Sequence, residues 1–301
     1  MASMPVTPTT PTTPATATPR VALDSLDVLW FQVSGTLCNL ACGHCFVSCS
    51  PTNHTHEHMS LEQVRAHLEE GAQLGVRELY FTGGEPFLNP EMEAILEAAL
   101  RYGPATVLTN GLLLDERRCS RLAALAEAAA YSLDVRISLD GWNAETNDPV
   151  RGAGTFDRIL AAIVRLHHAG LNPVVTVVEV SAEHRTDRGK ERFLELLRSR
   201  GITKPRLKVL PVFQLGNEAE RTGGYQSWQR LRESDAPEGG WSHLQCSSCR
   251  MVTDQGVWVC PILVNEPSAR MGETLSDTLG SFELAHPACW TCHAFGVSCR
   301  T

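Results

Sequence analysis

Three cysteines lie within eight residues, at Cys38, Cys42 and Cys45, with the spacing C-x3-C-x2-C. Thiolates are soft ligands, and at this spacing they favour an iron–sulfur cluster or a zinc ion. A 4Fe–4S cube held by three cysteines leaves one iron without a protein ligand, and that iron can chelate a small molecule. With His44 as a fourth ligand, the same stretch would instead form a closed zinc knuckle. The triplet alone leaves both interpretations open.

A second motif, from Tyr80 to Pro86, is typical of a strand that runs into a turn with the sequence Gly-Gly-Glu-Pro. Paired glycines at a strand end let backbone groups come close to a ligand, because they carry no side chain. Glu85 adds a carboxylate that can accept a hydrogen bond from an ammonium group. The turn therefore suits a ligand that carries an amine.

Together, and in this order, the two motifs resemble those of the radical S-adenosylmethionine (radical SAM) superfamily. Its members bind a 4Fe–4S cluster through C-x3-C-x-aromatic-C, and bind the methionine amino group through a GGEP-like turn. The resemblance implies that the three cysteines hold the cluster and that His44 lies near the adenine. It also implies which residues hold the methionine end, namely Gly83, Gly84 and Glu85.

Six of the eleven cysteines lie near the C-terminus: Cys246, Cys249, Cys260, Cys289, Cys292 and Cys299. The stretch 251–259 between them predicts a hairpin that turns near Gly256. On spacing alone, four of these cysteines suit a zinc ribbon. That set would be Cys246, Cys249, Cys289 and Cys292.

A C-x9-Gly-x3-C element followed by C-x2-C also resembles the truncated SPASM or twitch domains of radical SAM enzymes, which carry an auxiliary 4Fe–4S cluster. This resemblance implies a different set of ligands: Cys246, Cys260, Cys289 and Cys292. The family usually has one more residue between the glycine and the next cysteine, and this chain carries two extra cysteines. If one ligand differs from the set above, Cys299 is the expected substitute.

The elements that must position these motifs alternate along the chain. From about residue 27, short β-rich runs alternate with helical patterns, which predicts βα units and a parallel sheet. The predicted strands are residues 28–34, 77–82, 105–109, 133–140, 173–180 and 206–212. The predicted helices are residues 61–75, 91–102, 115–130, 156–169 and 189–200. With the family resemblance, these units imply a partial (β/α)6 barrel.

The expected organisation is an α/β radical SAM barrel followed by a small twitch- or SPASM-like domain. Residues 1–19 are rich in Thr and Pro, have nothing to bury and are expected to be disordered. The barrel takes residues 20–213. Residues 214–244 predict a partly helical connector or lid that contributes to substrate binding. Residues 245–301 form the auxiliary-cluster domain.

Alternation along the strands predicts which side chains face the barrel interior. In residues 133–140 four apolar side chains alternate with Asp134, Arg136, Ser138 and Asp140. The apolar set packs against the surrounding helices, so the polar set lines the interior. The same count turns five more side chains inward: Gln32, Ser34, Tyr80, Thr82 and Lys208. Because buried polar groups need partners, this interior predicts a polar-substrate site at the strand C-terminal ends.

Further residues that match the radical SAM family lie at those strand ends. In related enzymes a serine and an arginine contact the carboxylate of S-adenosylmethionine, and the resemblance implies these roles for Ser138 and Arg151. It also implies cofactor contacts from Thr109 and Asp140, although Asp140 and the glycine after it would also suit a simple turn. Glu179 is either a cofactor contact or a substrate anchor, and the sequence leaves both open.

Four cysteines are not needed as cluster ligands: Cys49, Cys119, Cys249 and Cys299. Cys119 lies on a predicted outer helix and is expected to be structural, and Cys49 has no recognisable partner. Cys249 lies three residues from a predicted ligand, in a segment expected to cover the barrel mouth. A spare buried thiol is usually inert. The position of Cys249 nevertheless makes it a candidate hydrogen-atom donor.

Three histidines alternate in a polar loop soon after the cysteine triplet, at His54, His56 and His58. Alternating histidines can bind a metal. Their polar neighbours favour a solvated loop instead.

Length and composition limit the class of protein. With 301 residues, 43% of them hydrophobic, the chain can bury one large core and a small appendage. Eleven cysteines without a signal peptide suit metal ligation in the reducing cytoplasm. No stretch reaches the apolar length of a membrane span, and no basic stripe with aromatics indicates nucleic-acid binding. The net charge of −8 is compatible with a small cationic substrate.

Over almost its full length the chain also resembles aminoglycoside-tailoring radical SAM epimerases. The resemblance implies a polycationic pseudo-oligosaccharide, inverted at the aminomethyl-bearing carbon of its terminal sugar. A 5′-deoxyadenosyl radical would abstract hydrogen, and Cys249 would return it from the opposite face. Asp140 and Glu179 near the mouth are compatible, because buried ammonium groups need carboxylate partners. A flavodoxin- or ferredoxin-type protein is the expected electron donor.

Two other functions stay open. A twitch-type radical SAM dehydrogenase of an aminocyclitol would use the auxiliary cluster to oxidise the substrate radical. From a different class, an electron-carrying or metal-binding module would perform no catalysis. The Gly-Gly-Glu-Pro turn, Ser138 and Arg151 argue against a carrier, which has no use for a site of this kind.

Overall fold

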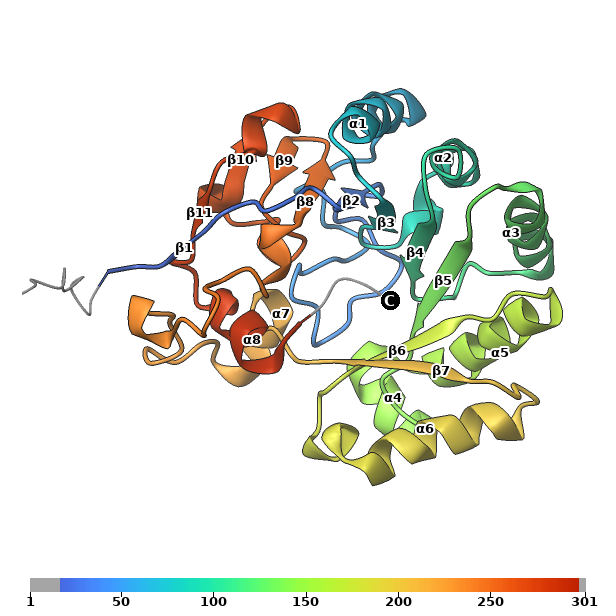
Figure 1. Cartoon of the computed structure of the whole chain (residues 1–301). Coiled ribbons are helices and arrows are strands. Elements are labelled where there is room, and N and C mark those ends of the chain that lie inside the picture. The colour runs from blue at the N-terminus through green and yellow to red at the C-terminus, as the bar shows by residue number, and fades with distance from the viewer. Residues whose placement is uncertain (1–16, 298–301) are drawn as a thin grey trace, which may run out of the picture.

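In the computed structural model, which describes residues 17–297, one sheet of nine strands runs in the order β10-β9-β8-β2-β3-β4-β5-β6-β7. Strands β2 to β7 are parallel and form a curved sheet (Figure 1), and we call its concave side, away from the outer helices, the lumen side. Most of the predicted tail, and Cys299, lie outside the described residues.

The predicted βα units are confirmed. The parallel strands are β2 (Val28–Gln32), β3 (Glu78–Thr82), β4 (Ala105–Thr109), β5 (Leu133–Ser138), β6 (Val174–Val178) and β7 (Arg206–Leu210). The outer helices are α1 (Leu61–Gln73), α2 (Met92–Ala99), α3 (Glu116–Ala128), α5 (Thr155–His168) and α6 (Asp187–Ser199). Each overlaps a predicted element and differs from it only by a few residues at the ends.

Within the barrel, helix α4 (Ala144–Arg151) was not predicted. Pro149 lies inside it, and prolines in helix interiors are unfavourable, so the sequence shows no helical pattern there. The helix begins with a capping box. The Asn143 side chain accepts from the backbone N–H of Thr146, and Oγ1 of Thr146 accepts from the backbone N–H of Asn143. It carries Arg151 in its last turn.

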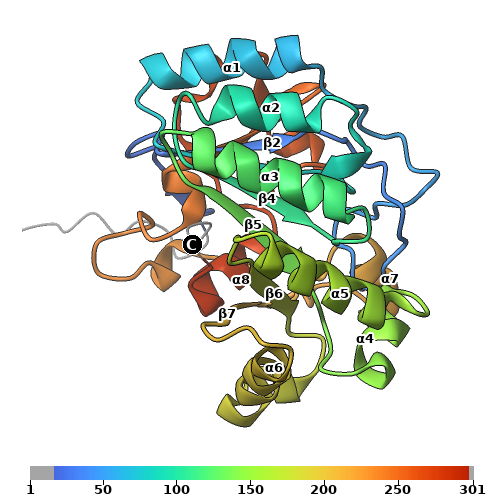
Figure 2. The same ribbon diagram turned by 90° about the vertical axis from the view of Figure 1, so that its right-hand side faces the viewer.

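Strand alternation divides the side chains as predicted. Phe31 and Phe81 join the core between the sheet and its outer helices, whereas Trp30 and Tyr80 stack on the lumen side with ring centroids 4.6 Å apart. Figure 2 shows α1, α2, α3 and α5 side by side over the outer face of the sheet. None of the helices in the described part of the chain is long and apolar enough to cross a membrane.

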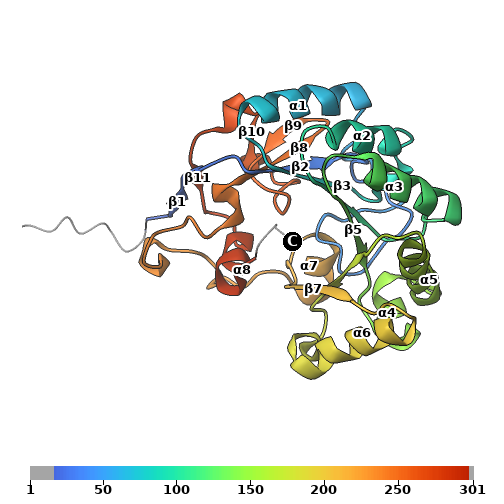
Figure 3. The same cartoon turned by 45° about the vertical axis from the view of Figure 1, so that its right-hand side comes forward.

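The C-terminal segment extends the barrel sheet. β8 (Cys249–Thr253) pairs in parallel with β2, and β9 (Gly256–Trp258) pairs antiparallel with β8, which confirms the predicted hairpin. β10 (Arg270–Gly272) follows, and β1 (Arg20–Val21) pairs with β11 (Phe282–Glu283). Helices α7 (Gly216–Thr222) and α8 (Ala288–Phe295) lie at the open side of the barrel (Figures 1 and 3).

Candidate functional site

The three-cysteine loop follows β2 at the C-terminal edge of the parallel strands. The backbone N–H of Leu40 donates to Sγ of Cys38 (3.4 Å), and the Asn110 amide also points at this sulfur (3.7 Å). Burial raises the pKa of Cys38 to about 12, so a thiolate at this position needs positive charge beside it. Donors aimed at a buried sulfur fit a thiolate that ligates iron.

The Gly-Gly-Glu-Pro turn packs directly against that loop. The N–H of Gly84 donates to O of Gly35 (2.8 Å), and the N–H of Glu85 donates to O of Leu37 (3.0 Å). A Cβ atom on Gly84 would lie 2.1 Å from the Leu37 carbonyl oxygen and 2.8 Å from Cβ of Cys38. Only glycine allows this approach. The fold therefore joins the two motifs that the sequence suggested.

Glu85 links this turn to the end of β4. Its buried carboxylate accepts from Oγ1 of Thr109 (2.7 Å), N of Asn110 (2.8 Å) and N of Phe87 (3.2 Å). Burial raises the pKa of Glu85, and the hydrogen bonds from Thr109 and Asn110 oppose this rise. Since a carboxylate has about four acceptor positions, the three bonds leave capacity for a ligand amine.

Asp140 is the centre of a buried ion-pair group rather than a simple turn residue. Its Oδ2 lies 2.6 Å from Nε of Arg151 and 2.9 Å from Nε2 of His44, and its Oδ1 accepts from N of Val178 (2.7 Å). Burial raises the pKa of Asp140, but Arg151 and His44 outweigh it and hold this pKa well below its usual range. The guanidinium of Arg151 has five N–H donors, so it can also bind a carboxylate.

Buried polar atoms on the lumen side call for a ligand. Within residues 17–297, Oε1 of Gln32, Oγ of Ser34 and Oγ1 of Thr176 are buried without a hydrogen-bond partner. Such atoms are rare in folded proteins and indicate a bound group or water. Ser138, at the end of β5, lies beside Thr176 in the sheet register and is half-buried. The lumen therefore suits a polar molecule.

The second cysteine group surrounds one small pocket. Its sulfur-bearing lining residues are the four twitch-type candidates Cys246, Cys260, Cys289 and Cys292, and most of the other lining residues are apolar. Cys249 does not line this pocket. Among the described residues no three His, Cys, Asp or Glu side chains are close enough to share one metal ion. The pocket therefore groups the four twitch-type candidates and leaves out Cys249, which the zinc ribbon would need.

Cys249 lies at the opposite end of the lumen from the three-cysteine loop. It pairs with Val28, the first residue of β2, and its side chain belongs to the inner apolar cluster with Met251. Strands rise about 3.3 Å per residue, so the two ends of β2 are about 13 Å apart. The expectation that Cys249 covers the barrel mouth is wrong. Because β8 is parallel to β2, its first residue, Cys249, lies at the N-terminal edge of the parallel strands, whereas the mouth is at their C-terminal edge. A cavity of about 340 Å³ touches Cys249 there.

His56 corrects the prediction of a solvated histidine loop. It is buried, with Nδ1 2.9 Å from Oδ1 of Asp254 and Nε2 3.1 Å from O of Val264. Asp254 also accepts from N of Glu57 (3.0 Å). The pair links the cysteine loop to the β8–β9 hairpin. Nothing in the sequence indicates this contact, because 198 positions separate the two residues.

Two other neighbours of the cysteine loop were not predicted. The N–H of Asn217 in α7 donates to O of Cys45 (3.0 Å), and its side-chain amide donates to O of Cys42 (3.1 Å). Cys49 donates its backbone N–H to Sγ of Cys45 (3.3 Å). The hydrogen bond from the thiol of Cys49 is the main cause that lowers the pKa of Cys45, and burial opposes it. The connector and Cys49 therefore support the loop directly.

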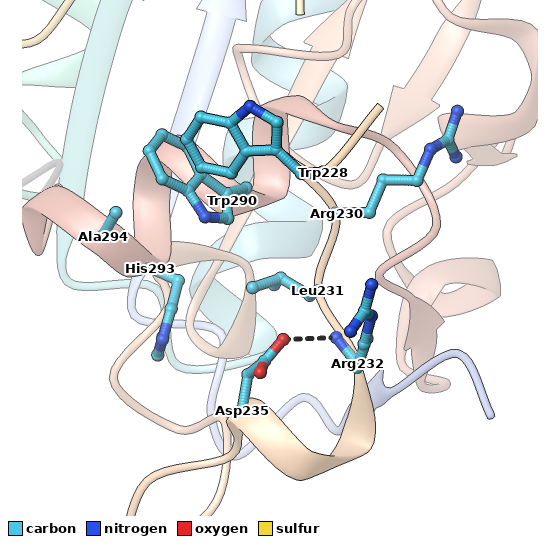
Figure 4. Close-up of a pocket in the computed structure, with 8 residues that line it drawn as sticks. All are labelled: Trp228, Arg230, Leu231, Arg232, Asp235, Trp290, His293 and Ala294. Atoms are coloured by element: carbon cyan, nitrogen blue, oxygen red, sulfur yellow. Dashed lines mark hydrogen bonds between the residues drawn. The ribbon is translucent and has the colours of Figure 1, made fainter. Parts of the chain in front are cut away.

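A pocket of about 600 Å³ lies between the connector and α8 (Figure 4). It is lined by Trp228, Arg230, Leu231, Arg232, Asp235, Trp290, His293 and Ala294. Asp235 accepts from the backbone N–H of Arg232 (2.8 Å), and Trp228 is 61% exposed. None of these side chains has a buried polar atom without a partner. The lumen, which has several, is the better candidate site.

Comparisons with known proteins agree with this geometry. A family model described as "Radical SAM superfamily" matches residues 33–204. Mycofactocin maturase MftC of Mycolicibacterium smegmatis is 32% identical over 148 residues, covering 49% of this chain and 36% of that protein. GTP 3′,8-cyclase of Chlorobaculum tepidum is 30% identical over 201 residues, covering 65% of this chain and 57% of that protein. The chain therefore matches less than two thirds of either relative.

Among solved structures, Streptococcus suis SuiB shares the fold with a TM-score of 0.62 at 14% identity. The match covers 86% of this chain and 66% of SuiB. SuiB has also been solved bound to S-adenosylmethionine, with a TM-score of 0.60.

Proposed function

Because the chain belongs to the radical SAM superfamily, we propose that it is an epimerase that inverts one sugar carbon of an aminoglycoside and converts neomycin C to neomycin B. Enzymes of this family use S-adenosylmethionine and a 4Fe–4S cluster. The finer assignment rests on the resemblance of the sequence to aminoglycoside-tailoring epimerases. The observation that carries it is the buried Cys249 on the lumen side of β8.

The cofactor site is assigned to residues that the fold brings together. The proposed cluster ligands are Cys38, Cys42 and Cys45. The proposed contacts to S-adenosylmethionine are His44, Gly83, Gly84, Glu85, Thr109, Ser138, Asp140 and Arg151. When bound, the two cofactors supply an electron and a carbon radical that abstracts hydrogen. The close packing of the Gly84 turn on the cysteine loop supports this assignment.

An epimerase needs a hydrogen donor on the substrate face opposite the abstracting radical. Cys249 suits this role, since it lies at the other end of the lumen from the cofactor loop. Its S–H bond breaks and a C–H bond forms on the opposite face, and the transfer is favourable because S–H is weaker than C–H. The sulfur then needs one electron and one proton to become a thiol again. Cys246, which lines the four-cysteine pocket, is three residues from Cys249 along the chain, so a cluster in this pocket suits the role of electron source.

The auxiliary site and the partners complete the proposal. Cys246, Cys260, Cys289 and Cys292 are assigned to an auxiliary 4Fe–4S cluster, supported by the pocket that they line together. A flavodoxin- or ferredoxin-type protein supplies electrons. The protein works in the cytoplasm, where reducing conditions keep its thiols available for ligation.

The test is an anaerobic reaction in deuterated water with reconstituted protein, S-adenosylmethionine, a strong reductant and a panel of aminoglycosides. We expect neomycin C to give neomycin B that carries one deuterium, together with 5′-deoxyadenosine, by mass spectrometry. A product lighter by two hydrogen atoms would instead identify the dehydrogenase. No cleavage of S-adenosylmethionine, with both clusters present, would indicate the non-catalytic carrier.

A variant pair tests the role of Cys249. Cys249→Ala should still form 5′-deoxyadenosine with neomycin C, but should give no inverted product. Cys119→Ala is the matched control, because Cys119 is also buried but lies on α3 outside the lumen. If Cys249→Ala inverts the sugar at the normal rate, the assignment of the donor is wrong.

A further inference from the structure

An ion pair and a cation–π contact, both made by Arg185, connect the end of β6 to the end of α8. Glu179 follows β6 and donates its N–H to O of Leu210 in β7 (2.9 Å), which holds it at the edge of the sheet. Its Oε2 lies 2.5 Å from Nε of Arg185. The Arg185 guanidinium also lies over the ring of Phe295, 4.5 Å from the centroid. Arg185 therefore contacts both this edge and α8.

This contact lies beside both the cofactor site and an opening. Val178, the residue before Glu179, donates its N–H to Asp140 of the buried ion-pair group. Phe295 lines a cavity of about 570 Å³ whose opposite wall is β7. Figures 1 and 3 show α8 and β7 on the two sides of the open part of the barrel. A molecule in this cavity meets Phe295, and Glu179 lies next to its wall because its N–H is bonded to Leu210, which lines the cavity.

The two members of the ion pair differ in exposure. The Glu179 side chain is 14% exposed, whereas that of Arg185 is 52% exposed. A nearly buried carboxylate needs a cation partner, but a half-exposed guanidinium can return to water at little cost. A different cation can therefore take the place of Arg185 without leaving a buried charge unpaired. The face of Phe295 also favours a cation.

We propose that Glu179 and Phe295 form a subsite for an ammonium-bearing sugar, and that Arg185 occupies it until the substrate arrives. This inference rests on the proposed function, which supplies a polycationic substrate. The ammonium group replaces the guanidinium at the Glu179 carboxylate, and the sugar packs on Phe295. Arg185 then moves into solvent. The subsite selects substrates that carry an amine at the matching position.

If the substrate ammonium replaces Arg185 at Glu179, substitutions of the two ion-pair residues should change aminoglycoside affinity in opposite directions. Glu179→Gln should weaken aminoglycoside binding about tenfold or more, because the ammonium loses its carboxylate. Arg185→Ala should strengthen binding severalfold, because the competing cation is gone. Arg185→Lys should bind close to the wild type. Calorimetry of neomycin C binding to the reconstituted protein measures all three, and melting temperatures identify any variant that fails to fold.

A second pair on α6 provides the control. Glu191 and Arg198 are both about half exposed, and their closest atoms also lie 2.5 Å apart. Glu191→Gln and Arg198→Ala should leave binding unchanged. Loss of affinity in both Glu179→Gln and Arg185→Ala would overturn the exchange, as would no change in either. If the wild type binds no aminoglycoside, the proposed function falls and this subsite with it; if it binds and the variants match it, only the subsite falls.

Discussion

The three-cysteine loop and the four-cysteine pocket use the same ligand type but are built differently. The loop takes all its thiols from eight consecutive residues, and Cys42 and Cys45 are only half-buried. The pocket gathers buried thiols from a 3₁₀ turn (Gln245–Ser247), from the loop that follows β9 and from α8. The loop borders the polar turn of Gly84 and Glu85, whereas the pocket has mainly apolar walls. We call the three-cysteine loop the open site, which suits ligand chemistry. We call the four-cysteine pocket the closed site, which suits electron storage.

The largest expected effect comes from the open site. Cys42→Ala should abolish 5′-deoxyadenosine formation and lower the iron content by about four atoms per chain, because the cube loses a ligand. Anaerobic iron analysis and chromatography of the products measure both effects. Cys119→Ala should change neither. Retention of all the iron by Cys42→Ala would remove the distinction between the two sites.

The closed site should fail in a different way. Cys289→Ala should also lose about four irons, but cleavage of S-adenosylmethionine should continue while inverted product stops at about one equivalent per chain. The thiol of Cys249 would no longer be restored after one turnover. Electron paramagnetic resonance should then show only the cluster of the open site. Full product formation by this variant would show that the second site is not needed for turnover.

The Gly-Gly-Glu-Pro turn beside the open site can be altered by a substitution that leaves every cysteine in place. Gly84→Ala would put a Cβ 2.1 Å from the Leu37 carbonyl oxygen, so the turn must shift. A displacement of about 1 Å at a reacting site can cost about 100-fold in rate. We expect a loss of that size, together with weaker binding of S-adenosylmethionine and unchanged iron content. Ala72→Gly in α1 is the control, because it exchanges the same two residue types away from the site. Gly75→Ala would not serve, because the φ of Gly75 is positive.

A smaller effect is expected where the two regions meet. Asp254→Asn should lower the free energy of unfolding by about 2 kcal/mol, because buried His56 loses its charged partner. Burial raises the pKa of Asp254, but the hydrogen bond from His56 outweighs it and the pKa is lowered. The stabilisation is therefore present above an ordinary aspartate pKa of about 3.9 and is lost as the pH falls through the lower folded value. Denaturant unfolding of wild type and variant should converge in acid; a constant gap would contradict this.

The smallest effect is expected away from both regions. Asp134 pairs with Arg206 through two contacts of 2.7 and 3.1 Å, but about a third of each side chain is exposed. Asp134→Asn should cost less than about 1 kcal/mol and leave the iron of both sites unchanged. Thermal unfolding and iron analysis measure these quantities. A loss of either cluster would mean that the barrel edge is coupled to the sites.

Local patterns were enough to predict the barrel. Alternation in β5 and the helical patterns of the outer helices depend only on nearby residues, and these elements are where the sequence indicated them. The three-cysteine loop and the Gly84 turn were visible in the sequence for the same reason, since Cys38, Cys42 and Cys45 lie within eight residues and the turn directly follows a clear strand. Helix α4 was missed because Pro149 hides its pattern.

The sequence by itself therefore determined the βα units, the spacing of the three-cysteine loop and the Gly-Gly-Glu-Pro turn. Only the tertiary structure decided that β8 lies beside β2, that Cys249 faces the lumen from its far end, and that Cys260 rather than Cys249 borders the second pocket. It also decided that His56 is buried against Asp254. The physical reason is distance along the chain: strand pairing and burial between remote segments depend on packing, which no short pattern of residues contains.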